Sequence, residues 1–144
     1  MLVDVKNRLD EEAIQDLISY SIFPDPDRLE QTVATYREDA ALKLYGCESE
    51  GEIIGIIGWN TDDNNVITIR HIAVRPDCRG AGFGRGLILE ALELATPAAI
   101  IAETDEEAVD FYRSIGFQVE SVGEKYPGVE RFKCVYMTDE DSES

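Results

Sequence analysis

The sequence predicts an α/β fold in which helices cover the faces of one mixed sheet. Three patterns support this fold class. Residues 66–74, VITIRHIAV, are apolar on both strand faces, which is typical of a central strand. Segments 41–47 and 52–59 flank the turn ESEG and predict a hairpin. Residues 104–115 carry apolar side chains at helical spacing.

The remaining elements follow from the same rules. Pro24 and Pro26 are expected to end the first helix. Thr104 and Glu107 form a capping-box pattern, and Gly116 is expected to stop that helix. The predicted order is a strand at 2–6, helices at 11–23 and 27–39, strands at 41–47, 52–59 and 66–74, a helix at 84–95, a strand at 98–103, a helix at 104–115, and strands at 117–122 and 130–137.

The pattern contains neither a repeat nor a linker, so we expect one domain over residues 1–137. Residues 138–144, TDEDSES, form an acidic tail that is expected to be disordered. No stretch has the length of a membrane span or the pattern of a signal peptide. Three cysteines and one histidine do not form a metal-binding pattern. These features predict a metal-free, cytoplasmic protein with reduced thiols.

The net charge of −17, from 30 acidic and 13 basic residues, excludes nucleic acid and anionic membranes as favoured partners. The same charge favours cationic ligands such as amines. Adaptation to salt and plain solubility are alternative reasons for it.

The segment RGAGFGRG at residues 79–86 opens a predicted helix, as phosphate-binding loops do. A Walker loop needs G-x-x-x-x-G-K-[ST], but from Gly80 the sixth position is Arg85. A dinucleotide fingerprint needs G-x-G-x-x-G, and Arg85 again stands where the last glycine belongs. Both templates are therefore excluded.

A third template fits. Residues 74–84 read V-R-P-D-C-R-G-A-G-F-G, and residues 108–117 carry A-x-x-F-Y-x-x-x-G-F. This pair of motifs resembles the GNAT superfamily of acyl-CoA-dependent N-acetyltransferases. The resemblance implies a mostly antiparallel sheet whose central strands splay apart.

The resemblance also implies acetyl-CoA as cosubstrate. Glycines let the backbone approach a pyrophosphate, and arginines add positive charge. Asp105 stands where many relatives place an asparagine that contacts the cofactor arm, and an ionised aspartate only accepts hydrogen bonds. The implied cofactor-binding residues are Ile72, Ala73 and Val74 through their backbone, then Arg79, Gly80, Ala81, Gly82, Phe83, Gly84, Arg85 and Asp105.

The resemblance assigns Tyr112 as the general acid that donates to the leaving thiolate. The general base is open, because Thr68 occupies the position of a glutamate that some relatives carry. Glu103, His71 or a water are the candidates. His71 shares its strand face with apolar residues, which favours a core histidine. Arg70 and Thr68 lie on the other face and are candidate substrate contacts.

Two functions from different classes remain open from the sequence. One is transfer of an acetyl group to a primary amine by direct attack in a ternary complex. The other is a non-catalytic CoA-binding or regulatory domain of the same fold. The expected acceptor is a small-molecule amine in preference to a protein, and either a monomer or a homodimer fits.

Overall fold

The computed structural model describes residues 2–22 and 25–138 of the chain. Two compact units are present, one built from residues 1–60 and 70–96 and the other from residues 61–69 and 97–144. The predicted extent of a single domain, residues 1–137, therefore stays a prediction. The acidic residues 139–144 and the predicted helix stop at Pro24 lie outside the described residues.

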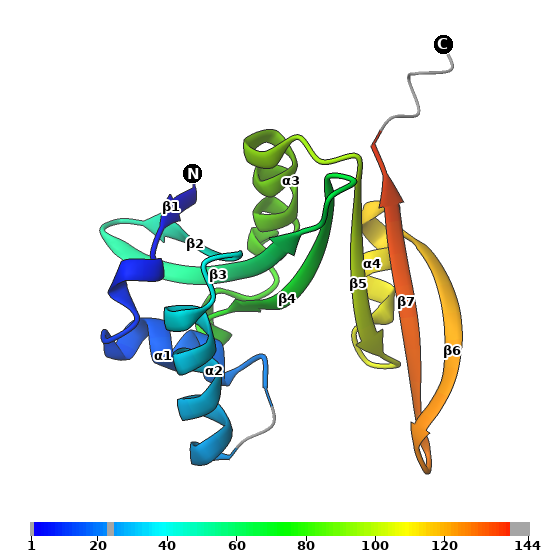
Figure 1. Ribbon diagram of the computed structural model, residues 1–144, viewed down its shortest axis with the longest axis horizontal. Coiled ribbons are helices and arrows are strands. Elements are labelled where there is room, and N and C mark those ends of the chain that lie inside the picture. The colour runs from blue at the N-terminus through cyan, green and yellow to red at the C-terminus, as the bar shows by residue number, and fades with distance from the viewer. Residues whose placement is uncertain (1, 23–24, 139–144) are drawn as a thin grey trace. The chain divides into compact units, whose positions relative to one another are not determined.

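The elements follow the predicted order, with two short 3-10 helices added (Figure 1). They are β1 (Leu2–Asp4), η1 (Lys6–Arg8), α1 (Glu12–Ser19), α2 (Pro26–Glu38), β2 (Leu42–Ser49), β3 (Glu52–Thr61), β4 (Val66–Val74), η2 (Pro76–Cys78), α3 (Phe83–Ala95), β5 (Ala99–Asp105), α4 (Val109–Ile115), β6 (Gln118–Tyr126) and β7 (Val129–Met137).

The strands form one mixed sheet in the order β1-β2-β3-β4-β5-β7-β6. β2 and β3 pair antiparallel, which confirms the predicted hairpin. β4 and β5 pair in parallel, and their ladder joins Val66–Thr68 to Ala99–Ile101. β4 continues beyond this ladder to Val74. The ladder between β4 and β5 therefore covers only the first three residues of β4, as expected for central strands that splay apart.

The core of the first unit lies between the sheet and the helices α1 and α2. α1 buries Ile14, Leu17 and Ile18 on one face, as their helical spacing predicts. α2 begins at Pro26, because Asp25 caps it by accepting the amide of Asp27 at 2.9 Å. Pro26 therefore lies beyond the end of α1 and is the first residue of α2.

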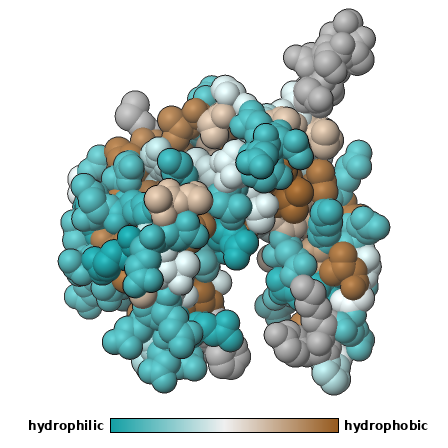
Figure 2. Space-filling model, viewed as in Figure 1, coloured by the Kyte–Doolittle hydropathy of each residue, from teal (hydrophilic) through white to brown (hydrophobic). Residues whose placement is uncertain are grey.

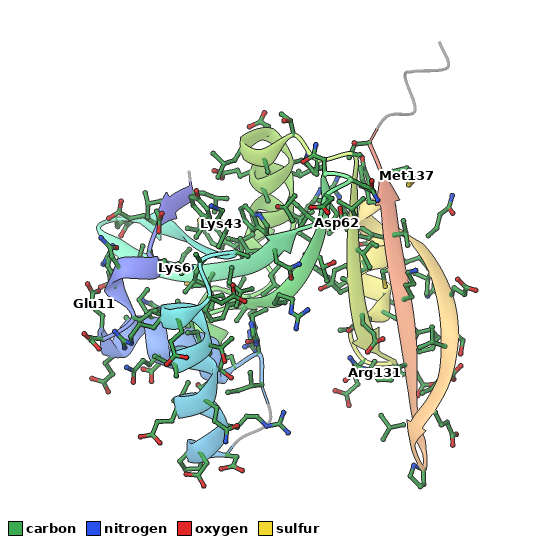
Figure 3. The ribbon with its side chains drawn as sticks, viewed as in Figure 1. Lys6, Glu11, Lys43, Asp62, Arg131 and Met137 are labelled. Carbon is green, nitrogen blue, oxygen red and sulfur yellow. The ribbon has the colours of Figure 1, made fainter. Side chains whose placement is uncertain are left out.

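Lys6 connects the start of the chain to the segment between α2 and β2 (Figure 3). Its Nζ donates to the carbonyl oxygens of Asp39, at 2.7 Å, and Leu42. A lysine ammonium that donates to backbone carbonyls satisfies acceptors that the helix end leaves open. This contact holds η1 against the first residue of β2.

The second unit is built on the antiparallel strands β5, β7 and β6, with α4 packed against β6 and β7. Tyr112 and Phe117 pack edge to face at 5.2 Å between ring centroids, and Phe117 meets Tyr136 at 5.4 Å. Gly116 ends α4 at φ 116°, as predicted. These three aromatic rings connect the end of α4 with β7.

The predicted helix over residues 104–115, with Thr104 as its cap, is wrong in its first turn. Thr104 and Asp105 are the last residues of β5 and pair with Phe132 and Arg131 of β7. Thr104 is buried there, and a β-branched side chain suits such a strand position. Pairing with β7 therefore extends β5 to Asp105, and α4 begins only at Val109.

The surface reflects the composition. Figure 2 shows hydrophilic residues over most of the face in view, as the net charge of −17 leads one to expect. Across residues 2–22 and 25–138, no helix combines the length and apolar character needed to cross a membrane. Cys47, Cys78 and Cys134 are all free thiols.

Candidate functional site

The glycine loop connects η2 to α3 in the first unit. Gly80 and Gly82 have φ angles of 85° and 88°, in the left-handed region that other residues rarely adopt. A Cβ at either position would meet nothing within 4 Å. These glycines are therefore needed for the backbone conformation, and the space around them is open.

The first turn of α3 presents unpaired backbone amides. Its N-cap is Gly82, which has no side chain to cap the helix. The first amide with a helical partner is that of Gly86, which donates to the carbonyl of Gly82 at 3.0 Å. Among the described residues, no acceptor is recorded for the amides of residues 83–85. Free amides and the positive end of the helix dipole form an anion-binding arrangement.

The two predicted phosphate-binding arginines differ in their surroundings. Arg79 donates through Nε to the carbonyl of Val74 at 2.9 Å, and its guanidinium lies 5.6 Å from the Tyr20 ring centroid. Arg85 is exposed, and no ion pair is recorded for it within the described chain. Arg85 is thus the more mobile charge, whereas Arg79 helps to hold the loop against the end of β4.

Arg75 is a structural residue that sequence reasoning missed. Its guanidinium pairs with Asp77 at 2.9 Å and with Glu52 at 2.7 Å. The hydrogen bond to Asp77 is the main reason that the pKa of Arg75 is raised. The sequence R-P-D at residues 75–77 could have indicated the ion pair with Asp77, because it places a carboxylate two residues after the arginine. This cluster fixes the entry to the glycine loop.

The side chains of β4 alternate as the sequence predicts. Ile69 and Ala73 are buried on one face, and Arg70 is exposed on the other. Thr68 belongs to the second unit, whereas Arg70 and the backbone of residues 72–74 belong to the first. The roles of Thr68 and Arg70 as substrate contacts stay predictions.

His71 is a partly buried histidine with a partner on α2. Its Nδ1 lies 2.6 Å from the hydroxyl oxygen of Tyr36, whose side chain is fully buried. Burial, aided by the nearby charge of Arg70, lowers the pKa of His71 to about 4. The imidazole is therefore neutral at pH 7. The strand alternation predicted a core histidine but could not identify Tyr36 as its partner.

The lowered pKa of His71 predicts a pH dependence of stability. Between pH 6.5 and about 4, the unfolded chain protonates this histidine and the folded chain does not. The free energy of unfolding therefore falls as pH falls through this window. We expect the wild type to lose about 2 kcal/mol more than His71→Asn between pH 7 and pH 4.5, measured by urea unfolding. Equal losses in the two proteins would contradict the neutral, buried state of His71.

Tyr112, the predicted general acid, is nearly buried on α4 in the second unit. Its exposed fraction is 5%, and burial, with a smaller effect of Cys134, raises its pKa to about 12. No hydrogen bond to its hydroxyl is recorded within the described chain. Because every fully buried side-chain oxygen in that part of the chain has a partner, this hydroxyl must reach accessible surface. It is thus a neutral donor that is not fully enclosed by the described chain.

Glu103 lies near the end of β5, in the strand predicted for it, whereas Asp105 is the last residue of β5 and not part of a helix as predicted. Arg131 of β7, labelled in Figure 3, approaches the Glu103 carboxylate at 3.6 Å. Asp105 accepts the amides of Glu107 and Ala108 through Oδ1, each at 3.1 Å. The Asp105 carboxylate therefore supports the turn before α4. Its predicted contact with the cofactor stays a prediction.

The described residues contain no group of three or more His, Cys, Asp or Glu side chains arranged to hold a metal ion. What they do present is an anion-binding loop in the first unit and a neutral phenol donor, Tyr112, in the second. An anion-binding loop of this kind suits a ligand that carries a phosphate group.

Comparison with known proteins supports this interpretation. The sequence model of the Acetyltransferase (GNAT) family matches residues 10–117, which include parts of both units. The peptidyl-lysine N-acetyltransferase YjaB of Escherichia coli is 38% identical over 61 residues, covering 38% of this chain and 42% of that protein. The chain spans only about two fifths of the length of the first curated relatives that it matches, 40% and 42%.

Solved structures share the fold. The spermidine/spermine N-acetyltransferase SpeG of Vibrio cholerae has a TM-score of 0.75 at 20% identity, covering 99% of this chain and 95% of that one. A GNAT family acetyltransferase of Elizabethkingia anophelis with acetyl-CoA bound has a TM-score of 0.63 at 17% identity, covering 85% and 89%. The family match covers both motifs that the sequence pointed to, so the chain belongs to the GNAT acetyltransferase family.

Proposed function

We propose that this protein is an N-acetyltransferase that moves an acetyl group from acetyl-CoA to a primary amine. The observation that carries the proposal is the glycine loop, whose left-handed Gly80 and Gly82 precede unpaired amides at the start of α3. A pyrophosphate needs such donors, and the open space above the loop lets it approach. Arg85 and Arg79 supply positive charge beside the same loop.

In the proposed reaction, the amine nitrogen attacks the thioester carbonyl directly within a ternary complex. The nitrogen–carbon bond forms and the carbon–sulfur bond breaks. The amine must first lose a proton, because only about one lysine-like amine in a thousand is neutral at pH 7. After attack the nitrogen loses a second proton to the base or to solvent, which leaves the neutral amide. Glu103, or a water molecule, is the candidate base. Tyr112 donates a hydrogen bond to the departing thiolate.

The environment of Tyr112 favours a hydrogen bond over complete proton transfer. A phenol with a pKa of about 12 would give its proton to a thiolate with a conjugate pKa of about 8.5 at a cost of ~5 kcal/mol. A donated hydrogen bond stabilises the same developing charge without that cost. The phenol therefore acts mainly by electrostatic stabilisation, and protonation of the thiolate is completed by solvent.

The proposed acceptor is a small cationic amine. SpeG is named for spermidine and spermine, which are small polyamines. The net charge of −17 raises the local concentration of cations around the protein. YjaB is named for peptidyl-lysine, so a lysine-containing peptide is the main competing acceptor.

The test combines calorimetry of CoA binding with thiol release from acetyl-CoA over a panel of polyamines, amino acids and lysine peptides. In the matched variants, Gly82→Ala places a Cβ in the left-handed region, whereas Gly86→Ala lies in α3 with open space around it. A left-handed alanine costs ~1–2 kcal/mol, so we expect Gly82→Ala to weaken CoA binding about tenfold. We expect Gly86→Ala to bind CoA like the wild type.

Each outcome has a distinct meaning. If wild-type protein does not bind CoA, both the transferase and the non-catalytic CoA-binding alternative fail. Binding without thiol release on any amine leaves the non-catalytic alternative. Release only with lysine peptides replaces the small-molecule acceptor with a protein.

A further inference from the structure

Tyr36 and His71 form a buried pair for which the motifs provide no role. The Tyr36 side chain is fully buried on α2, and its hydroxyl points at Nδ1 of His71 at 2.6 Å. Gly58 of β3 makes the space for that hydroxyl, because a Cβ there would lie 2.0 Å from the hydroxyl oxygen. Residues of α2, β3 and β4 therefore meet at one hydrogen bond.

The hydrogen bond determines the tautomer of His71. A buried phenol hydrogen needs an acceptor, and within the described chain Nδ1 is the partner recorded for this hydroxyl. Tyr36 must therefore donate and Nδ1 must accept. A neutral imidazole that accepts at Nδ1 carries its hydrogen on Nε2. His71 is thus held as an Nε2–H donor.

The Nε2 end of the ring is not fully enclosed by protein. No protein partner is recorded for it among the described residues, yet none of their fully buried side-chain nitrogens lacks a partner. Nε2 must therefore reach accessible surface. His71 also immediately precedes residues 72–74 of β4, whose backbone is predicted to bind the pantetheine arm.

We propose that His71 is a ligand-binding residue whose Nε2–H, fixed by Tyr36, donates a hydrogen bond to a carbonyl oxygen of the bound substrates. The inference rests on the proposed transferase function. It also removes His71 from the candidate bases, because Nε2 already carries a hydrogen and Nδ1 is occupied. The oxygen is an amide carbonyl of the pantetheine arm, because the small polyamines proposed as acceptors contain no carbonyl group.

The chain contains a single histidine, so ¹⁵N-histidine labelling gives one imidazole to observe by NMR. At pH 7 we expect the spectrum of an Nε2–H tautomer. A shift of Nε2 on adding CoA assigns the oxygen to the pantetheine arm. A shift only on adding an amine, with none on adding CoA, contradicts donation to the pantetheine arm. An Nδ1–H tautomer, or no shift in complexes that calorimetry shows to be formed, overturns the proposal.

Two substitutions separate ligand binding from structural support. His71→Asn keeps an oxygen near Nδ1 to accept from Tyr36 but removes the outer donor, whereas His71→Gln places an amide N–H near Nε2 and loses the Tyr36 contact. We expect His71→Asn to raise the KM of the ligand identified by NMR about tenfold, as loss of one hydrogen bond does. His71→Gln should stay within about threefold of wild type while melting at a lower temperature.

If His71 has only a structural role, His71→Asn should be closer to wild type than His71→Gln in both KM and stability. That result refutes the proposal. Failure of the wild type to bind CoA or release thiol instead refutes the transferase function itself. The two failures are therefore distinguishable in one set of measurements.

Discussion

Replacing Tyr112 by phenylalanine is expected to lower kcat about 100-fold or more while leaving CoA affinity within about twofold. The hydroxyl that is removed has no recorded partner within the described chain, so its loss leaves no buried group unsatisfied. The aromatic contacts of the ring with Phe111 and Phe117 are retained. The expected loss is therefore confined to the step in which the thiolate leaves.

The measurement is steady-state thiol release with the best amine of the panel, alongside CoA calorimetry and thermal unfolding. The melting temperature should change little, because phenylalanine fills the same space. Serine or alanine at position 112 would be uninformative, since it would also remove the aromatic packing. Turnover equal to wild type would exclude Tyr112 as the general acid, whatever its place in the motif.

Replacing Gly58 by alanine is expected to destabilise the fold by ~3–5 kcal/mol. The added Cβ would lie 2.0 Å from the Tyr36 hydroxyl oxygen and 2.8 Å from its Cζ. Tyr36 has little freedom to retreat, because it is fully buried and hydrogen-bonded to His71. Either the ring moves and breaks that hydrogen bond, or the strand moves. Urea unfolding at pH 7 measures the loss.

Gly46→Ala is the matched control for Gly58→Ala. Gly46 lies on the neighbouring strand β2, and its added Cβ would meet a methyl group of Ile53 at 2.9 Å. The overlap is smaller than the 2.0 Å approach at Gly58, and no hydrogen bond has to break to relieve it, so a smaller loss is expected. In a double-mutant cycle, Tyr36→Phe should partly relieve Gly58→Ala. Strict additivity of the two losses would show that the hydroxyl is not the obstacle.

Some elements could be predicted because local chemistry determines them. The β-branched run of β4 matches its predicted bounds, and Gly116 ends α4 through a left-handed conformation. The start of α4 could not be predicted in this way. The capping pattern at Thr104 is local, but the β7 strand that pairs with Thr104 is distant in sequence, and that pairing prevails.

The family motifs could also be predicted from the sequence, because they depend on residues close together in the chain. The glycine spacing at 80–84 excluded two other phosphate loops and indicated the donor, because backbone conformations of this kind depend on which residues lack a Cβ. The contacts of the predicted site residues were harder to find. Spacing alone could not show that Tyr20 lies beside Arg79, that Arg131 approaches Glu103, or that Asp105 supports a turn.

The sequence by itself therefore determined the family and the order of the elements, since these depend on local conformation and on motifs of fixed spacing, and it predicted the loop for the donor. Only the tertiary structure decided the state of His71. Its partner Tyr36 is 35 residues away, and the space for that hydroxyl comes from the missing Cβ of Gly58 on a third element. Tautomer and pKa depend on which groups folding brings together, and no single segment of the chain contains that information.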